Sequence, residues 1–169
     1  MSEITARAFA EAEWRTYRAL RLAALADAPE AFGATLAEAE AHRATHWQQR
    51  LRGLSPTLDL PLGGWVNGSP AGLAWGKLGL GNEPHAAHLF QMWVAPAHRG
   101  LGLGALLLGT VIDWARAQLA SHVELSVTCG DTPARRLYAA AGFTPWGDPE
   151  PLRPGSQVQA QPMRLALGD

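Results

Sequence analysis

The sequence contains little cysteine, little net charge and no long apolar run. Cys129 is the single cysteine in 169 residues, which excludes an intramolecular disulfide and a multi-cysteine metal site and favours a reducing compartment. A net charge of −1 argues against a basic surface for nucleic acid. No apolar run reaches the about 18 residues of a membrane span, and residues 1–3 start no signal-peptide pattern. We therefore expect a cytoplasmic protein with a small partner, and neither nucleic acid nor a membrane as partner.

The length of the chain predicts one domain over residues 1–169. A chain of this size buries roughly two-thirds of the surface that it exposes when unfolded. No internal repeat or linker divides it, and the alanine-rich first helices are its only biased segments. With 47% hydrophobic residues, a single core is expected.

The hydrophobic periodicity predicts both helices and short strands. In the first helix, Tyr17 and Leu20 or Arg21 recur at helical spacing. Residues 57–94 are short runs interrupted by glycine and proline, which indicates three antiparallel strands with an Asn67-Gly68 turn between the first two. We expect helices at 11–26, about 39–52, 104–119 and 133–141, and further strands at 4–9, 123–128, 143–146 and 158–167.

The strongest motif follows the third of those strands. An apolar run ends at Val94 and is followed, at residues 99–104, by Arg-Gly-Leu-Gly-Leu-Gly and then by a long helical pattern. Glycines at alternate positions let backbone N–H groups approach a ligand, and the positive end of the helix dipole points at the same place. This arrangement favours an anion, most often a phosphate.

Two well-known phosphate loops do not fit this motif. A P-loop requires a lysine and a serine or threonine directly after its glycines, and none is present. The dinucleotide fingerprint requires G-x-G-x-x-G and an acidic residue about 20 positions later, at the end of a second strand. Here the spacing is G-x-G-x-G, and Asp113 and Glu124 fall within the predicted helix and strand instead.

The motif resembles the pyrophosphate loop of the GNAT superfamily of acyl-CoA-dependent N-acetyltransferases. That family has a strand ending in V-x-P and then [QR]-x-x-G-x-[GA], which residues 99–104 match in full. Residues 131–143 are similar to a second family motif, N-x-x-A-x-x-L-Y-x-x-x-G-F, with Asp131 where the family usually has Asn. Because both motifs occur in order and at the expected spacing, the sequence is identified as a member of this superfamily.

The resemblance implies a GNAT-like α/β (α+β) fold. It is a mixed, mostly antiparallel sheet of about six to seven strands, flanked by helices and splayed after the strand that ends at Val94. Simple alternation would place Leu89, Gln91 and Trp93 on one face of that strand. The resemblance predicts that a bulge interrupts this alternation.

The resemblance also implies direct transfer of an acetyl group from acetyl-CoA to a primary amine of a small molecule or a peptide. Tyr138 matches the family tyrosine that protonates the departing thiolate. A phenol with a pKa of about 10 is protonated at neutral pH and can serve as this acid. The residues implied to bind the cofactor are Met92, Trp93 and Val94 along the strand, Arg99, Gly100, Leu101, Gly102, Leu103, Gly104 and Ala105 in the loop, and Asp131.

The sequence does not settle the general base. Many family members carry a glutamate in the strand before the loop, where this chain has Gln91. His88 is the candidate base, acting through water, and His85 and Glu124 are nearby titratable residues. No metal site is expected. The residues expected to line the acceptor site are Pro29, Phe32, Gly33, Trp93 and Trp146.

The function and the oligomeric state both stay open at this point. The missing glutamate also fits a non-catalytic acyl-CoA-binding or regulatory module, whereas the presence of Tyr138 favours catalysis. Homodimers are common in the resembling family, so a homodimer is a further expectation.

Overall fold

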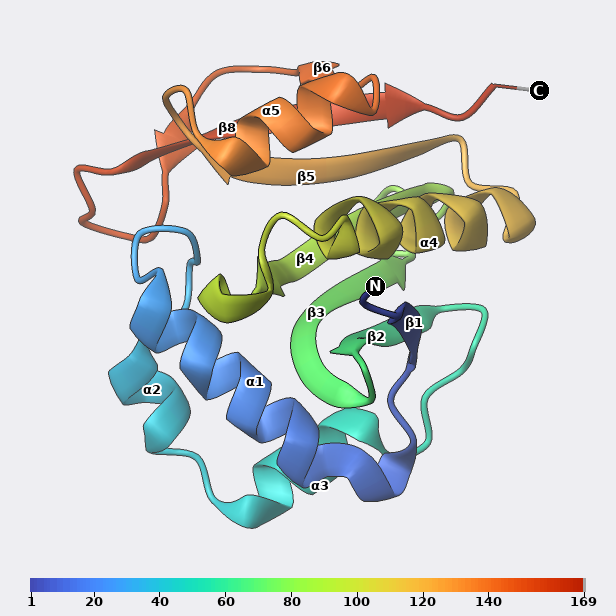
Figure 1. Ribbon diagram of the computed structural model, residues 1–169. Helices are drawn as coiled ribbons and strands as arrows, with labels where there is room; N and C mark the ends of the chain where they lie inside the picture. Colours follow the sequence, from blue (N-terminus) through green and yellow to red (C-terminus); the bar gives the residue numbers. More distant parts are fainter. Residues whose placement is uncertain (169) are drawn as a thin grey trace.

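The computed structural model describes residues 1–168 and shows one mixed sheet with helices on both faces (Figure 1). Within these residues the sheet has eight strands in the order β1-β2-β3-β4-β5-β8-β6, and β7 also pairs with β8. No helix of the described chain is long and apolar enough to cross a membrane. The strands are β1 (Ile4–Ala8), β2 (Asp59–Val66), β3 (Ser69–Leu78), β4 (Ala86–Val94), β5 (His122–Thr128), β6 (Thr144–Pro145), β7 (Glu150–Pro151) and β8 (Gln159–Ala166). The helices are α1 (Trp14–Asp27), α2 (Leu36–Glu40), α3 (Ala44–Leu51), α4 (Leu103–Ala117) and α5 (Pro133–Ala140), with short 3-10 turns η1 (Glu11–Glu13) and η2 (Pro96–His98).

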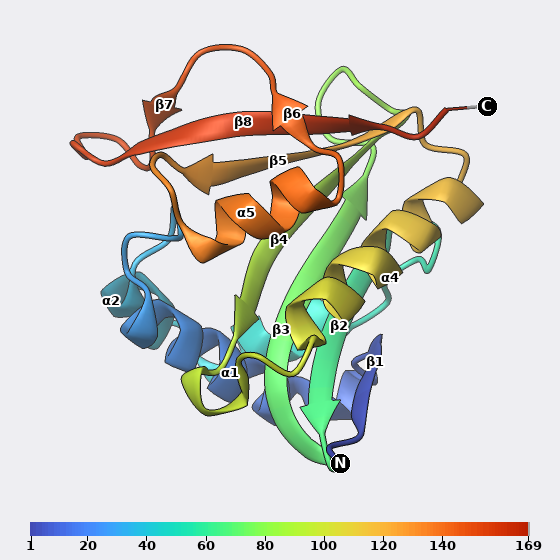
Figure 2. The same cartoon turned by 45° about the horizontal axis from the view of Figure 1, so that its top comes forward.

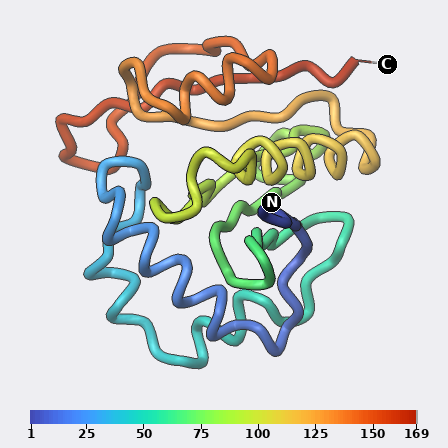
Figure 3. Tube along the Cα trace, in the orientation of Figure 1, coloured from blue at the N-terminus to red at the C-terminus, as the bar shows by residue number. Residues whose placement is uncertain are grey.

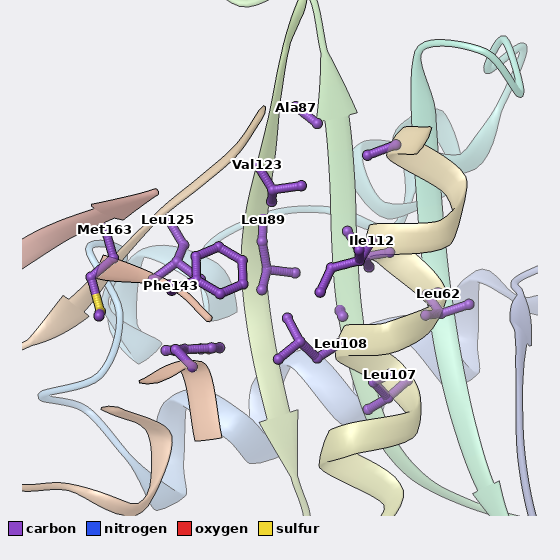
Figure 4. Close-up of a cluster of buried hydrophobic side chains, with 14 of the residues drawn as sticks. Leu62, Ala87, Leu89, Leu107, Leu108, Ile112, Val123, Leu125, Phe143 and Met163 are labelled. Atoms are coloured by element: carbon purple, nitrogen blue, oxygen red, sulfur yellow. The ribbon is translucent and has the colours of Figure 1, made fainter. Parts of the chain in front are cut away.

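The helices divide the core into two parts. The apolar stripe of α4 packs on one face of the sheet, and Figure 4 shows Leu107, Leu108 and Ile112 directed at the strands. Tyr138 on α5 extends this cluster over β5. On the other face, α1 and α3 cover β3 with an aromatic cluster that includes Tyr17. A fully buried leucine contributes about 2–3 kcal/mol, so each helix is held chiefly by its buried stripe.

A bulge interrupts β4, as expected. Leu73 lies opposite Trp93, but Trp75 lies opposite Phe90, so the register between β3 and β4 shifts between these pairs. Gln91, inside the shift, has a φ of 59°, a conformation that side chains other than glycine rarely adopt. The shift reverses the alternation after residue 91.

This reversal places Leu89 and Trp93 on opposite faces of the sheet. Leu89 packs in the core cluster under α4, whereas Trp93 packs with the aromatic cluster under α1. Simple alternation would have put both on one face. The bulge therefore turns the last residues of β4 over just before the glycine loop.

β4 and β5 separate beyond a short parallel pairing. They pair only from Ala86 opposite His122 to His88 opposite Glu124, and Figure 2 shows them diverging from there. The edges of β4 and β5 that face each other therefore lack strand partners over residues 89–94 and 125–128. We call this gap the open seam. The expected mixed, mostly antiparallel sheet, flanked by helices and splayed near Val94, is confirmed.

Some predicted elements differ from those in the structure. The single helix expected at about 39–52 is two helices, because the chain is extended at Arg43 before α3 begins. α4 ends at Ala117, and Leu119 has a φ of 61°, which no helix continues through. The two-residue strand β7 lies in a segment for which a loop was expected. The Asn67-Gly68 turn is confirmed, with φ values of 49° and 82°.

Candidate active site

A cleft of about 1890 Å³ runs along the open seam. It is lined by the second half of β4, the loop at residues 99–104, β5, α5 and the connection between α1 and α2. Pockets for one drug-sized ligand are about 300–1000 Å³. The cleft is therefore large enough for two substrates side by side.

The N-terminus of α4 presents free donors to this cleft. Gly102, with a φ of 88°, precedes the helix, and no side chain caps it. The N–H of Leu106 donates to the carbonyl of Gly102, at 3.1 Å. Among the described residues, the N–H groups of Leu103, Gly104 and Ala105 have no such partner. These donors and the positive end of the helix dipole favour an anion here.

Arg99 is tied to the end of α1. Its Nη2 donates to Asp27 Oδ2 at 2.8 Å, and its Nε donates to the carbonyl of Val94 at 3.0 Å. The same Asp27 oxygen accepts from Trp93 Nε1 at 2.9 Å. The hydrogen bond from Trp93 and the pairing with Arg99 lower the pKa of the Asp27 carboxyl. The carboxylate therefore connects β4, the glycine loop and α1 at one point.

Tyr138 approaches the cleft from α5. Thr132 caps this helix by accepting from the N–H of Arg135 at 3.1 Å, and Pro133 occupies its first turn. Tyr138 is only 6% exposed and packs edge to face on Phe143. Burial raises the pKa of its phenol, so the hydroxyl is protonated throughout the neutral range. Its hydroxyl has no hydrogen-bond partner among the described residues.

A row of charged side chains crosses β4, β5 and β8 at the narrow end of the seam. His88 Nε2 lies 3.0 Å from Glu124 Oε2, and the other oxygen of Glu124 accepts from Arg164. Arg164 also bonds Glu83 and covers the ring of Trp146. Nδ1 of His88 is buried without a partner. Neither ring nitrogen of His88 is therefore open to direct contact with an acceptor in this geometry.

Two connections between elements meet at one end of the cleft. Figure 3 shows residues 28–35, between α1 and α2, beside residues 152–158, between β7 and β8. The Arg153 guanidinium joins them by donating to three backbone carbonyls, and we call this contact the Arg153 latch. The accepting residues are Pro29 (2.7 Å), Phe32 (2.8 Å) and Gly33 (3.1 Å).

Comparison with known proteins identifies the family. The model of the acetyltransferase (GNAT) family matches residues 9–143. The chain belongs to the GNAT acetyltransferase family. The mixed sheet, the open seam and the glycine loop before α4 are all present in the structure, as the resemblance to this family implied.

Curated relatives of this GNAT chain match part of it. A mycothiol acetyltransferase of Acidothermus cellulolyticus is 41% identical over 83 residues, which are 48% of this chain and 25% of the relative. A streptothricin acetyltransferase of Streptomyces lavendulae is 37% identical over 68 residues, which are 40% of this chain and 36% of the relative. The matched part thus spans about a quarter to a third of each relative.

Solved structures share the fold over nearly the whole chain. An acetyltransferase of the GNAT family from Streptococcus pneumoniae has a TM-score of 0.81 at 21% identity, covering 98% of this chain and 100% of the other. A Salmonella typhimurium protein described as yncA, solved with its cofactor acetyl-CoA, has a TM-score of 0.79 at 20% identity, covering 99% and 95%. At such identities the likeness is one of fold.

The GNAT fold brings most of the residues singled out in the sequence to one cleft. Leu101 and Ala105 do not line it with their side chains, but both belong to the loop and helix start that bound it. The predicted residues that line the cleft are His88, Met92, Trp93, Val94, Arg99, Gly100, Gly102, Leu103, Gly104 and Tyr138. The predicted acceptor residues Pro29, Phe32, Gly33, Trp93 and Trp146 line it as well.

Asp131 lies apart from these residues. Its carboxylate is exposed and pairs with Arg136 at 2.8 Å, and it is not among the residues that line the cleft. Thr132, not Asp131, caps α5. A contact of Asp131 with the cofactor stays a prediction from the motif.

Sequence reasoning missed one residue that lines this cleft, Arg21, and one that contacts a lining residue, Tyr17. Tyr17 on α1 donates its hydroxyl proton to Gln91 Oε1 at 2.8 Å, directly at the bulge. Arg21, one turn later, lines the cleft and is buried. A signal for both was present, because an arginine recurred with Tyr17 on the apolar stripe of the first helix.

Proposed function

We propose that this chain transfers an acetyl group from acetyl-CoA directly to a primary amine, without a covalent enzyme intermediate. The observation that carries the proposal is the cleft itself. An unpaired strand edge, a helix N-terminus with free N–H donors and a protonated phenol all border one space. Such a cleft offers a place for an extended polar chain, for a phosphate group and for a leaving thiolate.

The donor would lie along β4 and the start of α4. The N–H groups of Leu103, Gly104 and Ala105 fit the pyrophosphate of coenzyme A, because they have no partner among the described residues. The edge of β4 at Met92 and Val94 fits the pantetheine amides, since it lacks a strand partner. When bound, acetyl-CoA supplies the thioester that an amine can attack.

Tyr138 would protonate the thiolate that leaves. Its phenol is buried, remains protonated at neutral pH and makes no internal hydrogen bond that would have to break first. A positioned acid of this kind contributes about 10²- to 10⁴-fold in rate. The amine, held deprotonated at the bulge, attacks the thioester carbon while the thiolate leaves with the proton of Tyr138.

The amine proton needs another acceptor. His88, paired with Glu124, is the titratable group of the sheet face that lies closest to the bulge along β4. Because both nitrogens of His88 are engaged or buried, we infer that water carries the proton to this pair rather than direct contact. A water relay also leaves the ion pair between Glu124 and Arg164 intact.

The acceptor is proposed to be a small molecule or a peptide. A curated relative is named a streptothricin acetyltransferase, which favours a small molecule. A non-catalytic acyl-CoA-binding module is the second candidate, because Gln91 stands at the bulge without a carboxylate. The cytoplasmic location and the homodimer expected from the sequence stay predictions.

The test is release of free coenzyme A thiol from acetyl-CoA across a panel of amines, by wild type, Tyr138→Phe and His88→Gln. We expect kcat for Tyr138→Phe to fall on the order of 10²-fold or more, with the affinity for acetyl-CoA unchanged. His88→Gln should lose the acidic limb of the pH–rate profile. If acetyl-CoA binds but no amine is turned over, the result would instead support the binding module. Full activity of Tyr138→Phe would exclude Tyr138 as the general acid.

A further inference from the structure

Arg21 is a buried cation that no anion compensates. Its side chain belongs to a residue only 8% exposed, and its Nη1 is buried without a hydrogen-bond partner. Within residues 1–168, no carboxylate lies within 4.0 Å of it and no hydrogen bond from its guanidinium is formed. Burying an unpaired charge is costly, and natural proteins rarely retain one unless a ligand supplies the partner.

The guanidinium lies beside the proposed reaction centre. Arg21 follows Tyr17 by one helical turn, about 5–6 Å, on the same face of α1, and Tyr17 bonds Gln91 at the β4 bulge. The guanidinium stacks on the ring of Phe32, 4.8 Å from its centroid. All four residues border the acceptor half of the cleft, since Arg21, Phe32 and Gln91 line it and Tyr17 contacts Gln91.

Three carboxylates that line the cleft are paired with groups other than Arg21. Asp27 is bound to Arg99 and Trp93, and Asp59 is bound to Lys77 at 3.1 Å. Glu124, across the seam, is bound to Arg164. None of these three therefore compensates the charge of Arg21.

Arg50 and His46 are further basic residues in this wall of the cleft. Arg50, stacked on Trp75, lies in the same wall of the cleft and interacts unfavourably with the charge of Arg21. His46 lines the same wall, and burial together with His42 and Arg50 lowers its pKa, so it is neutral at pH 7. Burial likewise lowers the pKa of Arg21, because it disfavours the charged form of the guanidinium.

We propose that Arg21 binds a carboxylate of the amine acceptor, so that the acceptor is a small amino acid rather than a simple amine. This inference rests on the proposed transfer to an amine and names its substrate class. A guanidinium can hold a carboxylate through two parallel hydrogen bonds, which fixes the orientation of the molecule that carries it. With the carboxylate on Arg21, the amine of an amino acid points toward the bulge and the open seam.

The alternative is that Arg21 serves only to pack against Phe32. The two accounts differ in stability as well as in rate. If Arg21 were only structural, Arg21→Gln would lower the melting temperature, because the stacking contact would be lost. If it awaits a ligand, Arg21→Gln removes an unpaired buried charge, and the melting temperature of the ligand-free protein should be unchanged or higher.

The decisive experiment compares L-amino acids with their primary amides as acceptors in the thiol-release assay. We expect wild type to prefer the acids by at least about 10²-fold in kcat/KM, since the amides leave the buried cation unpaired. Arg21→Gln should abolish that preference by raising KM for the acids, and it should leave KM for acetyl-CoA unchanged. Arg21→Lys should retain part of the preference. Arg18→Gln, an exposed arginine on the same helix, is the matched control and should behave as wild type.

Calorimetric binding of N-acetyl-L-amino acids and their amides to wild type separates the two proposals. Preferential binding of the acids without any turnover would contradict the acetyltransferase activity and leave the carboxylate site standing. Turnover with equal use of acids and amides, a preference that survives Arg21→Gln, or no preferential binding of the acids would each overturn the carboxylate site.

Discussion

Glu124 is held between His88 and Arg164 in the wall of the cleft. Burial is the largest single effect on its carboxyl and raises the pKa, but the hydrogen bonds and charges of Arg164 and His88 together outweigh burial, and the pKa is lowered. The unfolded carboxyl titrates near pH 4.3, above the folded value. The stability from this pairing is therefore complete above that pH and is lost as the pH falls through the folded pKa.

We expect Glu124→Gln to lower the free energy of unfolding by about 3 kcal/mol near neutral pH, because it leaves Arg164 without its buried partner. The difference from wild type should shrink as the pH falls below about 4, when wild type also loses the charge. Urea unfolding over this pH range measures both effects. Glu40→Gln, at an exposed position, is the control, and a difference that stayed constant with pH would contradict the assignment.

Two glycines with positive φ, one in the loop before α4 and one after α3, allow backbone strain to be compared at two sites. Gly100 has a φ of 80° and Gly53, after α3, has a φ of 66°, and a Cβ added at either meets nothing within 4 Å. Gly100→Ala and Gly53→Ala should therefore each cost about 1 kcal/mol of backbone strain. Of these two glycines, Gly100 lines the cleft and Gly53 does not.

We expect this pair of variants to separate strain from ligand contact. Gly100→Ala should weaken acetyl-CoA binding on the order of 10-fold, because it shifts the loop that leads to the free N–H groups, whereas Gly53→Ala should bind as wild type. Isothermal titration with acetyl-CoA, beside thermal melts of both, makes the comparison. Equal affinity in the two variants would show that the loop conformation does not matter for the donor.

At the scale of elements, sequence predicts what local signals encode. The Asn67-Gly68 turn, the capped α5 and the apolar stripe of α4 could each be predicted, because turn residues, caps and periodicity are properties of short segments. The separation of α2 from α3 and the strand β7 could not. β7 is two residues long and exists because β8 lies beside it.

At the scale of the whole molecule, the Arg153 latch joins two distant parts of the chain at the proposed acceptor end of the cleft. It ties a connection that follows α1 to one that precedes β8, and the sequence separation between Arg153 and Pro29 is 124 residues. The latch involves three carbonyls and a single side chain, so Arg153→Ala should free residues 28–35 without unfolding the sheet.

For Arg153→Ala we expect faster amide exchange in residues 28–35, a rise in KM for the acceptor and unchanged affinity for acetyl-CoA. Hydrogen exchange with mass spectrometry and the thiol-release assay measure these changes. Arg135→Ala, a partly exposed arginine on α5 without an ion pair among the described residues, is the matched control. Unchanged exchange in residues 28–35 would mean that other contacts hold this connection.

At this scale, many residues that line the cleft could be predicted, but Arg21 and the Arg153 latch could not. Residues 99–104 and Tyr138 each lie within a short continuous motif, which can be recognised from the sequence. Arg21 and the Arg153 latch depend on contacts between distant segments, and their residues belong to no motif. Asp131 fits a motif position, and in the structure its carboxylate pairs with Arg136.

The open seam has a consequence for the purified protein. An unpaired strand edge is a template for other strands, and natural sheets usually protect such edges at their rims. Here the unprotected edges of β4 and β5 lie at the centre of the sheet, where only a bound molecule can cover them. We therefore expect the empty protein to self-associate more readily than the protein with acetyl-CoA bound in the proposed site.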